Sequence, residues 1–169
     1  MPEPYTVFLQ PCEMVLVTRP ARLKTVLGSC VGITMRVRSG GAAAMVHCLL
    51  PRADAPFHQL QAAEQYRYVD AAVERMLAAF ARRGAAAGNL EVKLFGGADH
   101  LASGGGESGY RVGRRNVDAA LESLAGHGIE PVSTVVGGRC GRLVEFDTSS
   151  GSVYVKRLPS PSAGCGGTK

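Results

Sequence analysis

Short segments in which apolar and polar residues alternate make up much of this chain, and a period of two is typical of strands that bury one face. The clearest is residues 30–37, CVGITMRV, where Cys30, Gly32 and Thr34 share one face and the residues between them share the other. A glycine turn follows, and AAAMVHCLL, residues 42–50, is the predicted returning strand of a hairpin. RLVEFD and SVYVKRL flank TSSG as a second hairpin, and we expect roughly eight short strands in all.

Two longer segments carry apolar residues three or four positions apart, which is the spacing of one helix face. The first is predicted from about Gln59 to Arg83; its apolar positions are Tyr66, Val69, Val73, Met76, Leu77 and Phe80. The second is predicted to follow Asn116 as its N-cap, with apolar positions Val117, Ala120, Leu121 and Leu124. Both helices therefore fall between blocks of strands.

Helices inserted between strand blocks, instead of alternating with every strand, predict an α+β fold. We expect a single-domain layered α/β sandwich of mixed, mostly antiparallel β-sheet with two main helices. The domain is expected to span residues 1–158, because a chain of 169 residues can bury one substantial core. Residues 159–169, PSPSAGCGGTK, have the composition of a disordered tail.

Composition and charge narrow the class of protein. The net charge is +5, but 14 acidic residues accompany 19 basic ones and aromatic residues are only 6%, which argues against a nucleic-acid-binding face. No apolar run approaches the ~20 residues of a transmembrane helix, and the start of the chain lacks a signal-peptide pattern, so we expect a cytoplasmic protein. Five cysteines with no CxxC pair favour free thiols over disulfides or a structural zinc site.

Cys30 and His47 stand at the start of one hairpin strand and near the end of the other. With a two-residue Ser39-Gly40 loop, His47 faces Gly32 and is the diagonal neighbour of Cys30 on the same face, while Cys48 points to the opposite, apolar face. A thiol becomes a nucleophile when a neighbouring base takes its proton, and His47 is the candidate base. The alternative is that Cys30 is a small core residue and His47 an ordinary strand histidine.

Other residues near this pair are candidates for supporting roles. Backbone N–H groups at Gly28-Ser29, or that of Cys30 itself, can stabilise an oxyanion. Thr25 lies on the strand leading into that turn and is the candidate group that orients the histidine; otherwise it is a β-branched strand residue. The glycine-rich residues 96–113 lack the Walker ending and are predicted to form a mobile rim beside the site. Cys30, His47 and Cys48 are a poor metal site, because alternation separates their side chains.

Taken together, these segments resemble the CheD family of chemoreceptor glutamine deamidases. The motifs that carry the resemblance are TVLGSCVGI, AMVHCLLP, KLFGGA, GRRNVDAALESLAGHGI and GRLVEFDTSSGSVYVKRL, between about Val7 and Leu158. The resemblance implies a layered α/β sandwich and a cytosolic protein-glutamine glutaminase of bacterial chemotaxis. Such enzymes convert glutamines in the helical cytoplasmic region of methyl-accepting chemoreceptors to glutamates, and they commonly bind the chemotaxis phosphatase CheC.

By the same resemblance, Cys30 matches the family nucleophile and His47 the family base. The family's catalytic threonine precedes LGSC and corresponds to Thr25 or, with a shift of one position, to the place of Lys24. The chain departs from the family pattern at three places, which are His100 in place of methionine, Val135 in place of an aspartate and Gln10-Pro11 in place of a glycine.

The expected reaction passes through a thioester: His47 takes the Cys30 proton, the thiolate attacks a glutamine carboxamide, ammonia leaves, and water releases glutamate. No cofactor or metal ion enters this scheme. Two alternatives stay open. One is a non-catalytic adaptor that binds the receptor or the phosphatase, and the other is a methylesterase that cleaves receptor glutamyl methyl esters through the same thioester.

Overall fold

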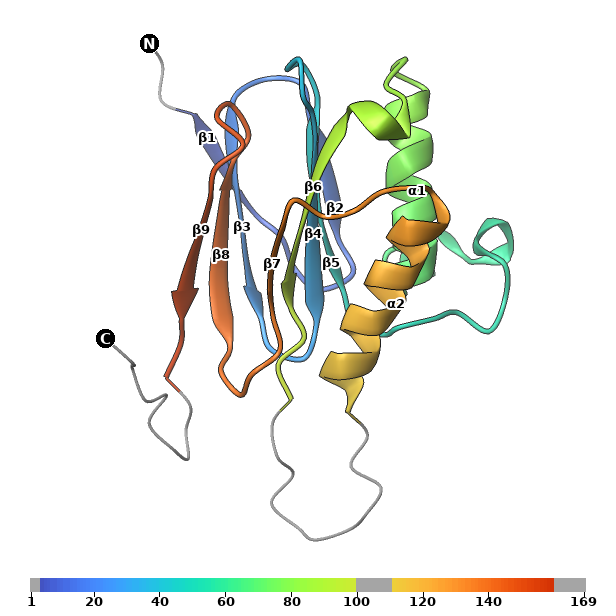
Figure 1. Ribbon diagram of the computed structural model, residues 1–169, viewed down its shortest axis with the longest axis vertical. Helices are drawn as coiled ribbons and strands as arrows, with labels where there is room; N and C mark the ends of the chain where they lie inside the picture. Colours follow the sequence, from blue (N-terminus) through green and yellow to red (C-terminus); the bar gives the residue numbers. More distant parts are fainter. Residues whose placement is uncertain (1–3, 100–110, 160–169) are drawn as a thin grey trace, which may run out of the picture.

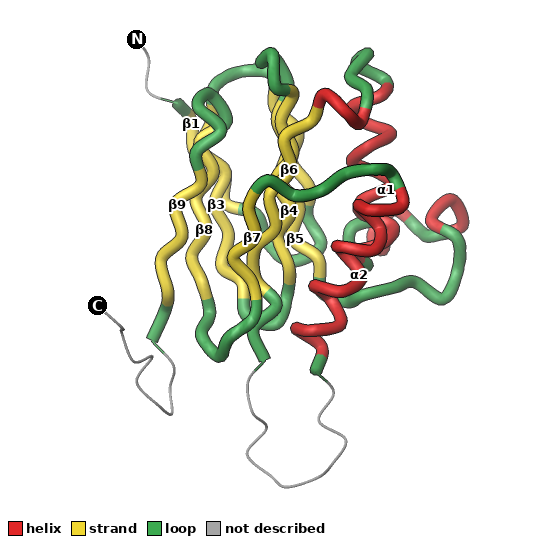
Figure 2. The backbone as a smooth tube through the Cα atoms, in the orientation of Figure 1, coloured by secondary structure: helices red, strands yellow, loops and turns green. Residues whose placement is uncertain are grey.

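A computed structural model describes residues 4–99 and 111–159 of the chain. Two β-sheets stack face to face, and two helices cover one side of the stack, so that the molecule has three layers (Figure 1; Figure 2). The predicted α+β sandwich is confirmed, with nine described strands instead of roughly eight. No helix in the described ranges is long and apolar enough to cross a membrane.

The strands form one four-stranded and one five-stranded sheet. The first has the order β1 (Tyr5–Phe8), β3 (Ala21–Leu27), β8 (Arg142–Asp147) and β9 (Val153–Arg157). The second has the order β2 (Met14–Val17), β5 (Ala43–Cys48), β4 (Val31–Val37), β6 (Leu90–Gly96) and β7 (Ser133–Val136). The pairs β1–β3 and β6–β7 are parallel and the others antiparallel, which gives the mixed, mostly antiparallel character that was expected.

The five-stranded sheet is the middle layer, and both of its faces are buried. One core lies between the two sheets and includes Leu23, Leu27, Met45, Phe95 and Phe146. A second core lies between the five-stranded sheet and the helices and includes Ile33, Met35, Val46, Met76 and Phe80. Because β4 is the central strand of this layer, its residues from Val31 to Met35 are buried whichever way they point, including the polar Thr34.

The helices are α1 (Val69–Ala81) and α2 (Val112–Gly126), and both differ from the predicted bounds. The prediction of a helix from Gln59 is wrong for residues 59–68, where only single 3₁₀ turns form, at Phe57–Gln59 and Ala62–Glu64. The chain then turns and meets the end of β5, where Leu49 and Leu50 both donate their N–H groups to the carbonyl of Arg67. A third 3₁₀ turn, Ala87–Asn89, precedes β6.

Asn116 does not cap α2, so that prediction is also wrong. The helix begins at Val112, with Arg111 in the N-cap position, and Asn116 lies inside it. Its side chain is fully buried and bonds to two distant carbonyl groups, those of Ser29 and Leu49, which a capping side chain at the helix start could not reach.

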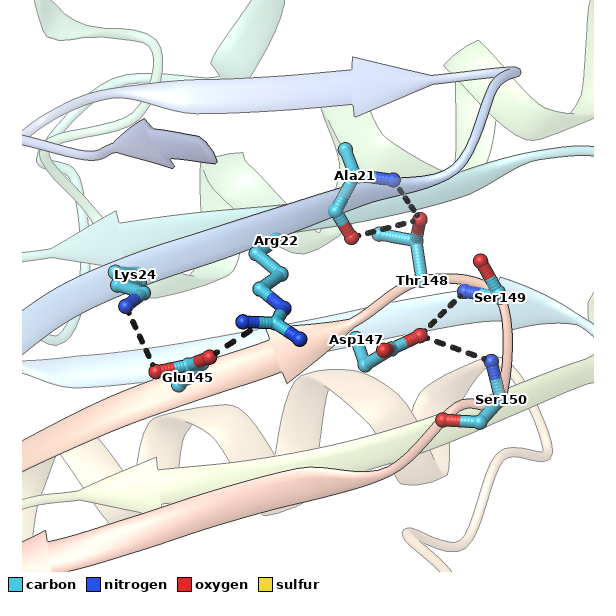
Figure 3. Close-up of polar contacts among 8 residues, drawn as sticks. All are labelled: Ala21, Arg22, Lys24, Glu145, Asp147, Thr148, Ser149 and Ser150. Atoms are coloured by element: carbon cyan, nitrogen blue, oxygen red, sulfur yellow. Dashed lines mark hydrogen bonds and ion pairs between the residues drawn. The ribbon is translucent and has the colours of Figure 1, made fainter. Parts of the chain in front are cut away.

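The outer face of the four-stranded sheet is open and carries ion pairs between strands (Figure 3). Lys24 of β3 pairs with Glu145 of β8 at 2.9 Å. At the end of β8, the Asp147 carboxylate accepts N–H bonds from Ser149 and Ser150 and closes the turn into β9. The second predicted hairpin, β8–β9, is confirmed by this turn and by the antiparallel ladder.

Candidate active site

Cys30 lies in the turn that carries the chain from one sheet to the other. β3 ends at Leu27 in the four-stranded sheet, and β4 begins at Val31 in the five-stranded sheet, so the turn sits at the edge of the space between them (Figure 1). The Cys30 side chain is half-buried against the core between the sheets. Cys30 is therefore partly accessible to solvent, and the turn that holds it is anchored at each end to a different sheet.

The three carbonyl groups of this turn are all held by hydrogen bonds. The carbonyl of Gly28 accepts from Ala98 N at 2.9 Å, and that of Cys30 accepts from Gly97 N at 2.8 Å. The carbonyl of Ser29, between them, accepts from the side-chain Nδ2 of Asn116 at 2.9 Å. The turn therefore has a fixed backbone conformation before any substrate arrives.

His47 occupies the predicted register of the β4–β5 hairpin. It faces Gly32, and Cys48 faces Val31, so that His47 lies on the side of Cys30 and Cys48 on the side of the helices, where it is fully buried. The connection is wider than the predicted two-residue loop, since residues 38–41 separate Val37 from Ala42. The register is nevertheless unchanged.

Thr25 holds His47 from the opposite sheet. Its hydroxyl donates to the carbonyl of Leu9 at 2.9 Å and lies 2.8 Å from Nδ1 of His47. A threonine hydroxyl has a single hydrogen, so the Nδ1 atom must be the donor in the second bond. Lys24, the alternative position for this residue, points to the outer face and pairs with Glu145.

The bond from Nδ1 fixes the other ring nitrogen of His47 as an acceptor. Nε2 is buried and has no hydrogen-bond partner among the described residues. Burial lowers the pKa of His47 to about 4, although the Glu13 carboxylate raises the pKa in part. At neutral pH the ring is therefore uncharged, with a free lone pair on Nε2, which is the form that a general base needs.

The thiol of Cys30 is also uncharged at rest. Burial raises its pKa above the ordinary value, its own backbone N–H lowers that pKa in part, and the Cys12 thiol adds to the rise. Both shifts favour the neutral thiol and imidazole over a thiolate–imidazolium pair. Nucleophilic attack by this thiol requires that its proton leave as the new bond forms, and His47 is on the correct face to receive it.

Two supports of the site did not emerge from the sequence. Gly96 has a φ of +101°, and a Cβ there would lie 2.2 Å from the carbonyl oxygen of Cys30, so only glycine fits. Cys12 donates its N–H to the carbonyl of His47 at 2.9 Å and has a φ of 65°. A glycine at this position would have indicated a positive φ from the sequence. Cys12 gives no such indication, although it adopts that conformation.

Several predicted features lie elsewhere or outside the described residues. His100 and most of the predicted glycine-rich rim lie outside them. Val135, on β7, packs against the core between the sheets. The expectation of free thiols holds for Cys12, Cys30 and Cys48 and is wrong for Cys140, which is disulfide-bonded. In residues 4–99 and 111–159, no group of three or more His, Cys, Asp or Glu side chains is arranged to hold a metal ion.

Comparison with known proteins places this chain in a family. The family model for CheD chemotactic sensory transduction matches residues 49–157, which begin just after His47. A protein of Geobacter sulfurreducens named "Probable chemoreceptor glutamine deamidase CheD 2" is 43% identical over 152 residues, which cover 90% of this chain and 89% of the relative. A protein of Maridesulfovibrio salexigens named "Probable chemoreceptor glutamine deamidase CheD" is 43% identical over 158 residues, with 90% and 91% covered.

Among solved structures, the chain is similar to the Bacillus licheniformis hypothetical protein YfiH, with a TM-score of 0.46 and 12% identity over 75% of this chain and 51% of that one. That likeness is too distant to bear on function. The sequence relatives, by contrast, match over most of both chains, and the family model matches more than half of this one. The chain therefore belongs to the CheD chemotactic sensory transduction family.

Proposed function

We propose that this protein is a protein-glutamine glutaminase that converts glutamine side chains of methyl-accepting chemoreceptors to glutamates. The family and the names of the relatives support the class of reaction. The single structural observation that supports the mechanism is the state of His47: Nδ1 bonds to Thr25, and the buried Nε2 has no hydrogen-bond partner among the described residues. A histidine with only a structural role would be expected to use both nitrogens when buried.

The proposed reaction has two halves. Nε2 of His47 takes the Cys30 proton while Sγ bonds to the carboxamide carbon, and the tetrahedral intermediate carries the negative charge on its oxygen. Protonated His47 then gives its proton to the departing amine, so that ammonia leaves and a thioester remains. Water, deprotonated by His47, attacks the thioester; glutamate and the Cys30 thiol are released, and no metal ion or cofactor takes part in any step.

The oxyanion needs a hydrogen-bond donor during both halves. Among the described residues, the N–H groups of Ser29 and Cys30 bond to no other residue, whereas the carbonyls on the same turn are all bonded. We assign these N–H groups to the oxyanion, because fixed backbone donors need no reorganisation when the charge develops.

The proposed substrate is the helical cytoplasmic region of the receptors, and the proposed location is therefore the cytoplasm. The chemotaxis phosphatase CheC is the proposed protein partner. These three assignments rest on the resemblance to the family and belong with the proposed glutaminase function.

Mass spectrometry of a receptor cytoplasmic fragment tests the proposal. Incubation with the protein should add about one mass unit at each modified glutamine, the NH₂ to OH exchange, with release of ammonia. Cys30→Ala should abolish the gain, and Cys12→Ser, a second partly exposed thiol, should leave it intact. A gain that persists in Cys30→Ala would refute the mechanism. Release of methanol instead of ammonia would identify a methylesterase, and binding of the fragment with no mass change would identify an adaptor.

A further inference from the structure

Asn116 links α2 to both halves of the proposed site. Its side chain is 0% exposed. The two hydrogens of Nδ2 go to the carbonyl of Ser29, at 2.9 Å, and to the carbonyl of Leu49, at 3.0 Å. Ser29 precedes the nucleophile, and Leu49 follows His47 by two residues, so one carboxamide joins the backbones that carry Cys30 and His47.

The cost of this arrangement points to a role beyond stability. Oδ1 of Asn116 is buried and has no hydrogen-bond partner among the described residues. A flipped carboxamide would place its oxygen against two carbonyl oxygens, so the assignment of Nδ2 is fixed by its partners. A buried polar atom left unsatisfied destabilises a fold, and such exceptions to good packing are expected where function requires them.

The Asn116 bond determines the direction of one peptide group. A trans peptide is planar, so its C=O and N–H point in opposite directions. The carbonyl of Ser29 points to Nδ2 of Asn116, on the side of α2, and the N–H of Cys30 in the same peptide must point away from α2. That N–H also lowers the pKa of the Cys30 thiol in part.

Asn116 is also the only side chain among the three donors that hold the turn. The carbonyls of Gly28 and Cys30 are bonded by the backbone N–H groups of Ala98 and Gly97, which no substitution other than proline removes. The Ser29–Cys30 peptide is therefore the one whose direction depends on a side chain. If that side chain is removed, this peptide can rotate without loss of the bonds on either side.

We propose that Asn116 is a positioning residue, which turns the Ser29–Cys30 peptide so that the N–H of Cys30 faces the developing oxyanion. This role rests on the glutaminase function proposed above. It acts through the backbone, and Asn116 itself does not touch the substrate.

Steady-state kinetics of Asn116→Ala on the receptor fragment, together with alkylation of Cys30 by iodoacetamide, test the proposal. Alkylation forms no oxyanion, so it reports the thiol and His47 alone. We expect kcat to fall about 100-fold, the size of effect seen when one oxyanion donor is lost. KM and the alkylation rate should stay within about threefold of the unchanged protein.

Thr148→Ala is the matched control. Thr148 is also buried, and its hydroxyl makes two hydrogen bonds to the backbone of Ala21 at the far end of the sheets. It should lower stability and leave kcat unchanged. A kcat of Asn116→Ala within about threefold of normal would overturn the proposal. A parallel fall of kcat and alkylation rate would also overturn it, because it would mean that Asn116 merely holds the thiol in place.

A measurement on the unchanged protein covers the case in which Asn116→Ala does not fold. The amide hydrogen of Cys30 should exchange with less than about 100-fold protection, because it bonds to no other residue and should point away from α2; greater protection would overturn the proposal. Cys30→Ala separates the two proposals. If it remains active, the glutaminase mechanism is wrong; if it is inactive and Asn116→Ala is normal, only the role of Asn116 is wrong.

Discussion

Replacement of Thr25 by valine tests how His47 is held, because valine keeps the shape of threonine and removes its hydroxyl. Two hydrogen bonds are lost: Nδ1 of His47 loses its acceptor at 2.8 Å, and the carbonyl of Leu9 loses its donor at 2.9 Å. Thr25 and Leu9 are 0% exposed and His47 is 3% exposed, so water cannot replace the missing partner. Each of the two unsatisfied buried groups costs ~1–3 kcal/mol, so we expect the free energy of unfolding to fall by about 2–6 kcal/mol.

The catalytic effect follows from the choice of tautomer. Without an acceptor at Nδ1, the ring gains nothing from keeping its hydrogen there, and a hydrogen on Nε2 would block that atom as a base. If the lost bond is worth ~1.4–2.8 kcal/mol to the active tautomer, kcat falls about 10- to 100-fold. Ammonia release from a receptor fragment gives kcat, and urea titration followed by circular dichroism gives the free energy of unfolding.

Thr25→Ser is the matched control, since it keeps the hydroxyl and loses one methyl group. We expect it to cost ~1 kcal/mol of stability and to keep most of the activity. The reasoning is refuted if folded Thr25→Val retains a kcat within about threefold of normal. It is equally refuted if Thr25→Ser loses as much activity as Thr25→Val, because the hydroxyl would then not be the group that matters.

Two further predictions concern pH and the glycine that supports the turn. The pKa of His47 is lowered from 6.5 in the unfolded chain to about 4 in the folded one, so between these values the unfolded chain binds more protons. The free energy of unfolding, from urea titrations at successive pH values, should therefore fall by about 3 kcal/mol as pH is lowered from 6.5 to 4. His47→Gln should reduce this dependence on pH. If the dependence is unchanged in His47→Gln, the lowered pKa does not belong to His47. Gly96→Ala places a Cβ 2.2 Å from the Cys30 carbonyl at a φ of +101°, whereas Gly84→Ala, at a φ of +78°, meets nothing within 4 Å. Gly84→Ala should cost ~1 kcal/mol of stability through backbone strain alone, and Gly96→Ala should cost more and slow alkylation of Cys30; equal losses would contradict the clash.

The hairpin shows what local pattern can predict. The faces of β4 and β5 follow from alternation, and the parity of the turn decides which residues share a face. His47 opposite Gly32 and Cys48 on the helix side were therefore predictable, even though the turn is wider than expected. The helical stripe of α1 was predictable for the same reason, but its start was not, because residues 59–68 form short turns and the carbonyl of Arg67 bonds to Leu49 and Leu50 beyond the end of β5.

Contacts between the two sheets, and between a sheet and a helix, were harder to predict from the sequence. Thr25 and His47 belong to different sheets, and nothing in either strand says that the sheets place them 2.8 Å apart. The choice between Thr25 and Lys24 did have a local signal, since Leu23, Thr25 and Leu27 alternate on one apolar face. Asn116 also had one: it falls on the buried stripe of its helix, between Gly113 and Ala120. A polar residue in such a stripe marks a long-range partner without identifying it.

The neutral state of Cys30 and His47 gives a reason for the hydrogen bonds that fix the backbone of the Cys30 turn. Burial disfavours both the thiolate of Cys30 and the imidazolium of His47, so both groups are uncharged before the reaction. In the proposed mechanism, the negative charge that develops on the substrate must then be stabilised by dipoles that are already in position. Hydrogen bonds from Gly97, Ala98 and Asn116 hold the three carbonyl groups of the turn. Because each peptide group is planar, these bonds also fix the direction of the N–H groups of Ser29 and Cys30.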